Sequence, residues 1–148
     1  SMSSNQIGNF LNSWTDGVIE IGRVYVEGGD YEKCAEKFIS SHYAFDNEET
    51  LFKPTFTKEV IFRNSKELAL SYFTGGDVAE DNGFALKPWG NISLEELHTI
   101  EENNLIVAMG ILNLKPVDEE EMTMLAFTFL LVHIDDSLKI KVHHSSPI

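Results

Sequence analysis

The first half of the chain shows the hydrophobic spacing of helices. Apolar residues recur at three- and four-residue steps over residues 7–25, which predicts one long amphipathic helix ended by Gly28-Gly29. Asp30 follows where the N-cap of a second helix is expected, because its carboxylate can accept a backbone N–H of the first turn. Ser65 stands in the same relation to a third, short helix that extends to residue 73 and is ended by Gly75-Gly76.

The second half shows the alternation of strands. The four expected strands are Ile92–Ile100, Leu105–Leu114, Met122–Ile134 and Leu138–Ser146. Leu51–Phe56 is expected to be extended, because Pro54 disfavours a helical conformation of the residue before it, and Val60–Phe62 is a short apolar strand candidate. A long loop, 77–90, is typical of a lid or a pocket wall. Helices first and a β-meander last predict an α+β fold, with the N-terminal helices packed on a strongly curved antiparallel sheet in one domain, residues 4–148.

The last predicted strand ends in two histidines and two serines. Strand side chains alternate between faces, so one face holds Leu138, Ile140, Val142, His144 and Ser146. The other face holds Lys139, Lys141, His143 and Ser145. The aliphatic residues mark the first face as the buried one, so this parity predicts that His144 and Ser146 point inward. An imidazole and a hydroxyl in an apolar interior need hydrogen-bond partners or water, and this indicates a small polar pocket.

Charge narrows the classes of partner. The net charge of −13 argues against nucleic acid, which needs a basic patch, and against an anionic membrane surface. A small anion the size of bicarbonate can still be bound locally. No uninterrupted apolar run long enough for a membrane span occurs.

The single cysteine and the first residues bear on compartment and processing. Cys34 has no partner for an internal disulfide and falls on the apolar side of the second predicted helix, which favours packing and a cytoplasmic location over a catalytic thiol. Residues 1–3 have the character of a tag remnant or disordered start.

Six short motifs together resemble one family. They are Gly28-Gly29-Asp30-Tyr31, Leu51-Phe52-Lys53-Pro54-Thr55, Leu70-Ser71-Tyr72-Phe73 with Gly75-Gly76, Gly83-Phe84-Ala85-Leu86-Lys87-Pro88-Trp89, Ala108-Met109-Gly110 and His143-His144-Ser145-Ser146. Their order and spacing resemble the iota-class carbonic anhydrases, which have the NTF2-like fold and are related to the calcium/calmodulin-dependent kinase II association domain. The resemblance implies a cone of bent sheet closed by helices, and metal-independent hydration of carbon dioxide to bicarbonate, a carbonate dehydratase (lyase) reaction.

The resemblance also implies the site residues. The family's pocket hydroxyls correspond to Thr55, to Tyr72 and to a serine of the last motif, where strand parity favours Ser146 over Ser145. Hydroxyls that donate to the developing bicarbonate oxygens would stabilise the transition state. His144 is the candidate proton relay, since its ordinary pKa lies near working pH.

Metal chemistry is the main alternative for the histidines. Adjacent residues of a regular strand point to opposite faces, so His143 and His144 cannot readily chelate one ion. Zinc, manganese or magnesium would need His144 plus ligands from elsewhere, and no familiar ligand spacing supplies them. We therefore expect no cofactor.

Other roles stay open at this stage. Arg63, Phe84 and Trp89 are candidate substrate-binding residues, although Arg63 can equally form a structural salt bridge and the two aromatic residues can close the mouth of the core. An apolar exposed side of the meander predicts a homodimer or a higher homo-oligomer. The same cone can also serve as a non-catalytic oligomerisation or small-ligand-binding module. A pocket filled by Phe129, Leu130 or Leu131 would favour that function.

Overall fold

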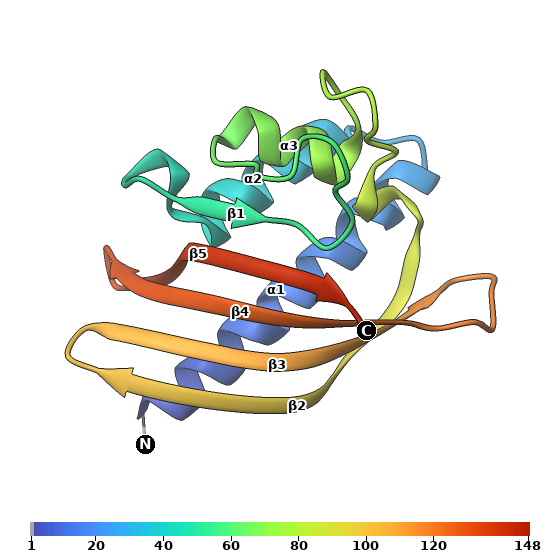
Figure 1. Ribbon diagram of the computed structural model, residues 1–148. Helices are drawn as coiled ribbons and strands as arrows, with labels where there is room; N and C mark the ends of the chain where they lie inside the picture. The colour runs from blue at the N-terminus through green and yellow to red at the C-terminus, as the bar shows by residue number, and fades with distance from the viewer. Residues whose placement is uncertain (1) are drawn as a thin grey trace.

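The computed structural model describes residues 2–148, with side chains from residue 5 onward, and Figure 1 shows its two layers. The elements are α1 (Met2–Val26), α2 (Tyr31–His42), β1 (Leu51–Lys53), α3 (Lys66–Thr74), β2 (Trp89–Glu102), β3 (Leu105–Pro116), β4 (Thr123–Ile134) and β5 (Ser137–Pro147), with short 3₁₀ turns at Ala44–Asp46 and Phe84–Leu86. The long helix α1 crosses one face of the sheet, α2 packs beside α1, and α3 packs against α2. The tag-remnant prediction, residues 1–3, falls on residues whose side chains are outside the described part.

The helix starts predicted from capping residues are confirmed. The Asp30 side chain accepts the Lys33 backbone N–H at 3.1 Å, and the Ser65 hydroxyl accepts the Leu68 N–H at 3.2 Å. Gly75 has φ 81° at the end of α3, a backbone conformation that favours glycine. No helix among the described residues is both long and apolar enough to cross a membrane.

The sheet is mixed, with strand order β1-β5-β4-β3-β2. The predicted meander β2 to β5 is antiparallel, but β1 adds a short parallel edge, with Leu51 beside Val142 and Phe52 beside His143. Two register shifts within β2 bend the sheet around the core. The inner face of β3 and β4 packs against α1 through buried residues that include Ile106, Ala108, Leu112, Leu125, Phe127 and Phe129.

The predicted strand at Val60–Phe62 is wrong. This segment belongs to no strand, and the Phe62 side chain is 60% exposed. Its neighbouring backbone N–H groups, on Lys58, Glu59 and Val60, donate to the Glu80 carboxylate at 2.8 to 3.0 Å. A side chain from the 77–90 loop therefore takes the hydrogen bonds that a neighbouring strand would have supplied.

A β-bulge reverses the predicted parity of β5. Leu131 pairs with Ile140 but the next pair is Leu130 with Val142, so Lys141 has no partner of its own. After this extra residue the faces exchange, and His144 and Ser146 are exposed on the outer side. The prediction that His144 and Ser146 point inward is wrong; His143 and Ser145, 4% and 2% exposed, occupy the interior instead.

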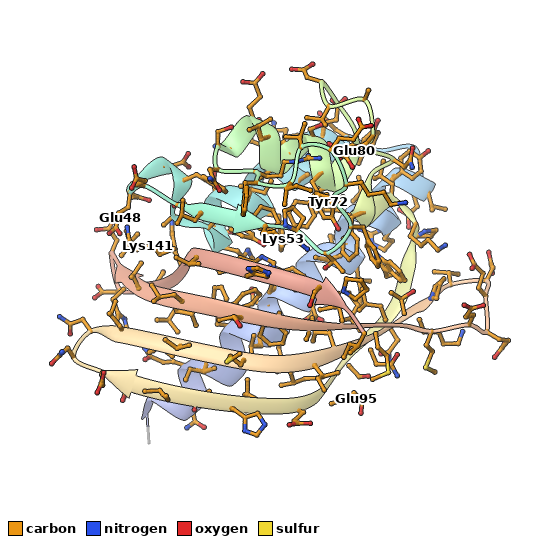
Figure 2. The ribbon with its side chains drawn as sticks, in the orientation of Figure 1. Glu48, Lys53, Tyr72, Glu80, Glu95 and Lys141 are labelled. Carbon is orange, nitrogen blue, oxygen red and sulfur yellow. The ribbon has the colours of Figure 1, made fainter. Side chains whose placement is uncertain are left out.

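Contacts of Lys141 hold the bulge. Its ammonium donates to Glu48 Oε1 at 3.0 Å and to the Glu49 carbonyl at 2.9 Å, and Figure 2 shows Lys141 beside Glu48. The segment after α2 thus fixes the point at which β5 changes face.

Candidate functional site

A small cavity lies where β1, α3, β4 and β5 meet. Its walls are mostly aromatic and aliphatic, from Trp14, Phe52, Pro54, Phe73, Phe84, Leu112, Leu125, Phe127 and Phe129. The polar lining side chains are Thr55, Tyr72, His143 and Ser145. The interior volume is about 10 Å³, room for about one water molecule. Hydroxyl-bearing side chains from three separate segments therefore line one small, mostly apolar cavity.

A hydrogen-bonded chain orients the serine of this cavity. Trp14 Nε1 donates to the Tyr43 hydroxyl at 3.2 Å, and that hydroxyl lies 2.8 Å from His143 Nδ1. His143 Nε2 lies 2.6 Å from Ser145 Oγ. Two residues apart on β5, His143 and Ser145 share the inner face, so the strand itself brings them together.

The chain of donors assigns the histidine tautomer. An indole N–H only donates, so the Tyr43 oxygen accepts from Trp14 and its own hydrogen is left for His143 Nδ1. His143 then carries its proton on Nε2 and donates it to Ser145 Oγ. With its lone pair engaged, Ser145 has its hydroxyl hydrogen free to donate into the cavity.

Burial keeps this imidazole neutral. It lowers the pKa of His143 to about 3, with smaller contributions from the charges of His144 and Lys53. The Phe52 ring stacks on the imidazole at a centroid distance of 4.7 Å, and the Phe129 ring meets it edge-on at 4.5 Å. At neutral pH His143 is therefore a fixed hydrogen-bond donor and not a proton relay.

This burial predicts a pH dependence of stability. The folded pKa, about 3, is below the ordinary value of 6.5, so between these pH values the unfolded chain binds more protons at His143. The stabilising contribution is complete above about pH 6.5 and is lost as the pH falls toward 3, by at most about 1.4 kcal/mol per pH unit. Urea unfolding of the wild type and of His143→Gln from pH 7 to 4 measures it. We expect a shallower pH slope in the variant; equal slopes would contradict the assignment.

Tyr72 and Thr55 contribute the other two hydroxyl groups that line the cavity. The Tyr72 oxygen accepts the Phe56 N–H at 3.2 Å, and the Thr55 side chain lines the same cavity. Burial raises the pKa of Tyr72, so the phenol keeps its proton and can donate it. Figure 2 shows Tyr72 below the loop that carries Glu80.

Arg63 does not line the cavity, and its role in substrate binding stays a prediction. Its guanidinium forms a two-fold ion pair with Asp81, at 2.6 and 2.8 Å, and also donates to the carbonyls of Val60 and Leu68. Asp81 also accepts the Ser71 hydroxyl at 2.6 Å. The Arg63 side chain is fully buried, 5.9 Å from the centre of the Tyr72 ring. Arg63 therefore stabilises, through Asp81 and Ser71, the part of α3 that carries Tyr72.

The two aromatic candidates lie on different walls. Phe84 stacks on Tyr72 at a centroid distance of 5.5 Å and separates the cavity from an open outer cleft of about 450 Å³. Trp89 lines only the outer cleft, and its indole N–H donates to the Phe84 carbonyl at 2.8 Å. Phe84 therefore borders the candidate site, and Trp89 supports Phe84.

The described residues offer no ready metal site. Within residues 2–148 no group of three or more His, Cys, Asp or Glu side chains is arranged to hold an ion. His143 faces the core with both nitrogens in hydrogen bonds, whereas His144 faces outward.

The sequence had not singled out Tyr43 or Trp14 as site residues, and parity had placed His143 outside. The spacing His-x-Ser was the available signal, but it occurs twice in register, as His143-x-Ser145 and as His144-x-Ser146. Only the bulge at Lys141 distinguishes the two.

Comparison with known proteins identifies the family of this chain. Residues 5–147 match the family described as metal-independent carbonic anhydrase. A metal-independent carbonic anhydrase from Nostoc sp. strain PCC 7120 is 31% identical over 141 residues, 90% of this chain and 68% of that protein. The crystal structure of a cyanobacterial iota-carbonic anhydrase complexed with bicarbonate superposes with a TM-score of 0.90 at 28% identity, covering 96% of this chain and 90% of that one.

A more distant structure defines the fold class. An NTF2-like protein from Shewanella oneidensis has a TM-score of 0.62 at 19% identity and covers 97% of this chain and 98% of its own. The fold is therefore NTF2-like and α+β, as predicted. Within that class, the chain belongs to the metal-independent carbonic anhydrase family, the iota class, which confirms the resemblance seen in the sequence.

Proposed function

We propose that this chain hydrates carbon dioxide reversibly to bicarbonate, without a metal, in the cavity bounded by Thr55, Tyr72 and Ser145. The observation that carries the proposal is the convergence of these hydroxyls in an apolar cavity beside a neutral histidine. The bicarbonate complex of the cyanobacterial relative supports this substrate. His144 and Ser146 have no part in the proposed site, because both face outward.

The proposed chemistry rests on position and hydrogen bonding. Once the Phe84 side chain has moved outward and widened the cavity, carbon dioxide packs against the apolar walls of Phe127 and Phe129, and a water molecule from the outer cleft faces its carbon atom. Negative charge develops on the substrate oxygens as the C–O bond forms, and the Ser145 and Tyr72 hydroxyls donate to them. The proton lost by the water passes to solvent or buffer in the outer cleft. Because the cavity holds about one water molecule, substrate enters when the Phe84 side chain swings outward.

One observation favours the non-catalytic alternative, a small-ligand-binding or oligomerisation module. Phe127 and Phe129 narrow the cavity to about 10 Å³, and Leu131 is fully buried behind them. If the narrow cavity does not admit carbon dioxide, the protein keeps its fold but does not catalyse hydration.

Stopped-flow hydration of carbon dioxide on chelator-treated protein separates these functions. We expect a rate above the buffer blank that chelation does not reduce and that added zinc, manganese or magnesium does not raise. A rate equal to the blank under all conditions would contradict the catalytic proposal and favour the non-catalytic binding module. Activity that appears only with metal would contradict the metal-free mechanism alone.

We also propose that the chain forms at least a homodimer through the outer face of the sheet. Val107, Leu130 and Val142 lie in one row across β3, β4 and β5, and Met109, 54% exposed, lies in the next row. An apolar sheet face of this kind is typical of an interface between copies. The lone Cys34 supports our proposal of a cytoplasmic location.

Met109→Glu is expected to convert the dimer to a monomer, because it buries an unpaired charge in the interface. Light scattering after size-exclusion chromatography measures the mass. Val26→Glu, at a residue 64% exposed on α1, is the matched control and should stay dimeric. A monomeric wild type at high concentration would contradict the proposal.

A further inference from the structure

A second serine–histidine pair lies outside the cavity, between α1 and α2. Ser13 Oγ on α1 is 2.8 Å from His42 Nε2 at the end of α2. The histidine is 9% exposed, whereas Ser13 is exposed to solvent. Nothing in the proposed hydration of carbon dioxide uses either residue.

The other ring nitrogen fixes the tautomer of His42. His42 Nδ1 lies 2.9 Å from the Phe38 carbonyl oxygen, which can only accept. The Ser41 hydroxyl, 2.8 Å from the same nitrogen, donates to that same carbonyl at 3.1 Å, so its oxygen is an acceptor toward His42. His42 therefore carries its proton on Nδ1. Its Nε2 holds a lone pair, and the Ser13 hydroxyl donates to it.

This arrangement is that of an activated nucleophile. The base is within hydrogen-bond reach of the serine, and a third group, the Phe38 carbonyl, orients the base. Burial lowers the pKa of His42, so the imidazole is neutral and able to accept a proton at neutral pH. The Phe38 ring also stacks on the imidazole at a centroid distance of 4.6 Å and limits its rotation.

An open groove of about 340 Å³ borders the pair. Phe10 and Leu138 give it apolar walls, and Asn9 lies one helical turn before Ser13 on the same side of α1. A short acyl group fits against the apolar walls, and the Asn9 amide is a groove side chain able to donate to an oxyanion.

We propose that Ser13 and His42 form an acyl-transfer site for small, uncharged carboxylic esters. Ser13 Oγ attacks the ester carbonyl and gives its proton to His42 Nε2; the alkoxide leaves with that proton, and Ser13 is acylated. Water then attacks the acyl group, again giving a proton to His42, and the carboxylic acid and free Ser13 are released. The reaction needs no oxidant, reductant or further co-reactant.

A fluorophosphonate probe and p-nitrophenyl acetate test the proposal on the full chain. We expect the probe to label Ser13, identified by peptide mapping, and the ester to be hydrolysed above the blank. Ser13→Ala should abolish both, and His42→Gln should lower both about a hundredfold, as expected for loss of a general base. Asn12→Ala is the matched control, because Asn12 precedes Ser13 on α1 and is exposed but does not line the groove, and it should retain most of the reactivity.

Two further measurements distinguish the loss of the Ser13 nucleophile from a change in structure. Circular dichroism and carbon dioxide hydration should be unchanged in Ser13→Ala, because Ser13 is exposed and lies outside the cavity. No labelling of the wild type, or equal labelling of Ser13→Ala, would overturn the proposal. Ester hydrolysis that survives Ser13→Ala but is lost in Ser145→Ala would overturn it too, since the activity would then belong to the cavity.

Discussion

Ser145→Ala is expected to lower kcat for carbon dioxide hydration about a hundredfold or more, the usual effect of deleting one preorganised donor. Ser145 receives the Nε2 proton of His143 at 2.6 Å, so its own hydrogen is directed into the cavity. Alanine removes this donor and leaves the apolar walls in place. KM should change less than kcat, because the lost hydrogen bond strengthens as charge develops on the substrate oxygen.

Ser146→Ala is the matched control for that experiment. Ser146 is the next residue of the same strand, but it is exposed on the outer face of the sheet. Its replacement should leave the hydration rate within about twofold of wild type. The reverse result, with Ser146→Ala inactive and Ser145→Ala active, would mean that β5 follows regular alternation and that the bulge assignment is wrong.

Local patterns predict the three helices and the four long strands. Asp30 and Ser65 cap helices as predicted, because a capping side chain needs only the backbone of its own first turn. The four long strands are also predicted from local sequence, because the alternation of apolar and polar residues along one strand indicates its buried face. The short parallel strand β1 has only three residues and depends on its neighbour, so its sequence carries little signal.

The inward face at the end of β5 could not be predicted locally. Lys141 bulges where its ammonium reaches Glu48 and Glu49, some ninety residues earlier in the chain. The resemblance named Thr55 and Tyr72, and both line the cavity. Strand parity then chose His144 and Ser146, because each member of the His-x-Ser pair repeats one residue later. The resemblance therefore named two residues that line the cavity, whereas strand parity selected the copy of the His-x-Ser motif that faces outward.

Asp81→Ala is expected to lower the free energy of unfolding by about 3–5 kcal/mol, the usual cost of removing one partner of a buried ion pair. Arg63 and Asp81 are 0% and 2% exposed, so the remaining guanidinium cannot recover its hydration. The matched control is Glu27→Ala, which removes a partner of Arg23 that is 61% exposed and should cost at most about 1 kcal/mol. Urea unfolding of both variants measures the difference.

The Asp81→Ala variant also distinguishes a structural role of Arg63 from a role in substrate binding. Asp81 joins the guanidinium to Ser71, the residue that precedes Tyr72 on α3, so losing Asp81 also loosens the support of a site hydroxyl. If Arg63 is structural, Asp81→Ala should lower stability and kcat together. If Arg63 also bound substrate, releasing it from Asp81 would change KM as well, with the same loss of stability. Because every donor nitrogen of Arg63 already has a protein acceptor, we expect the first result.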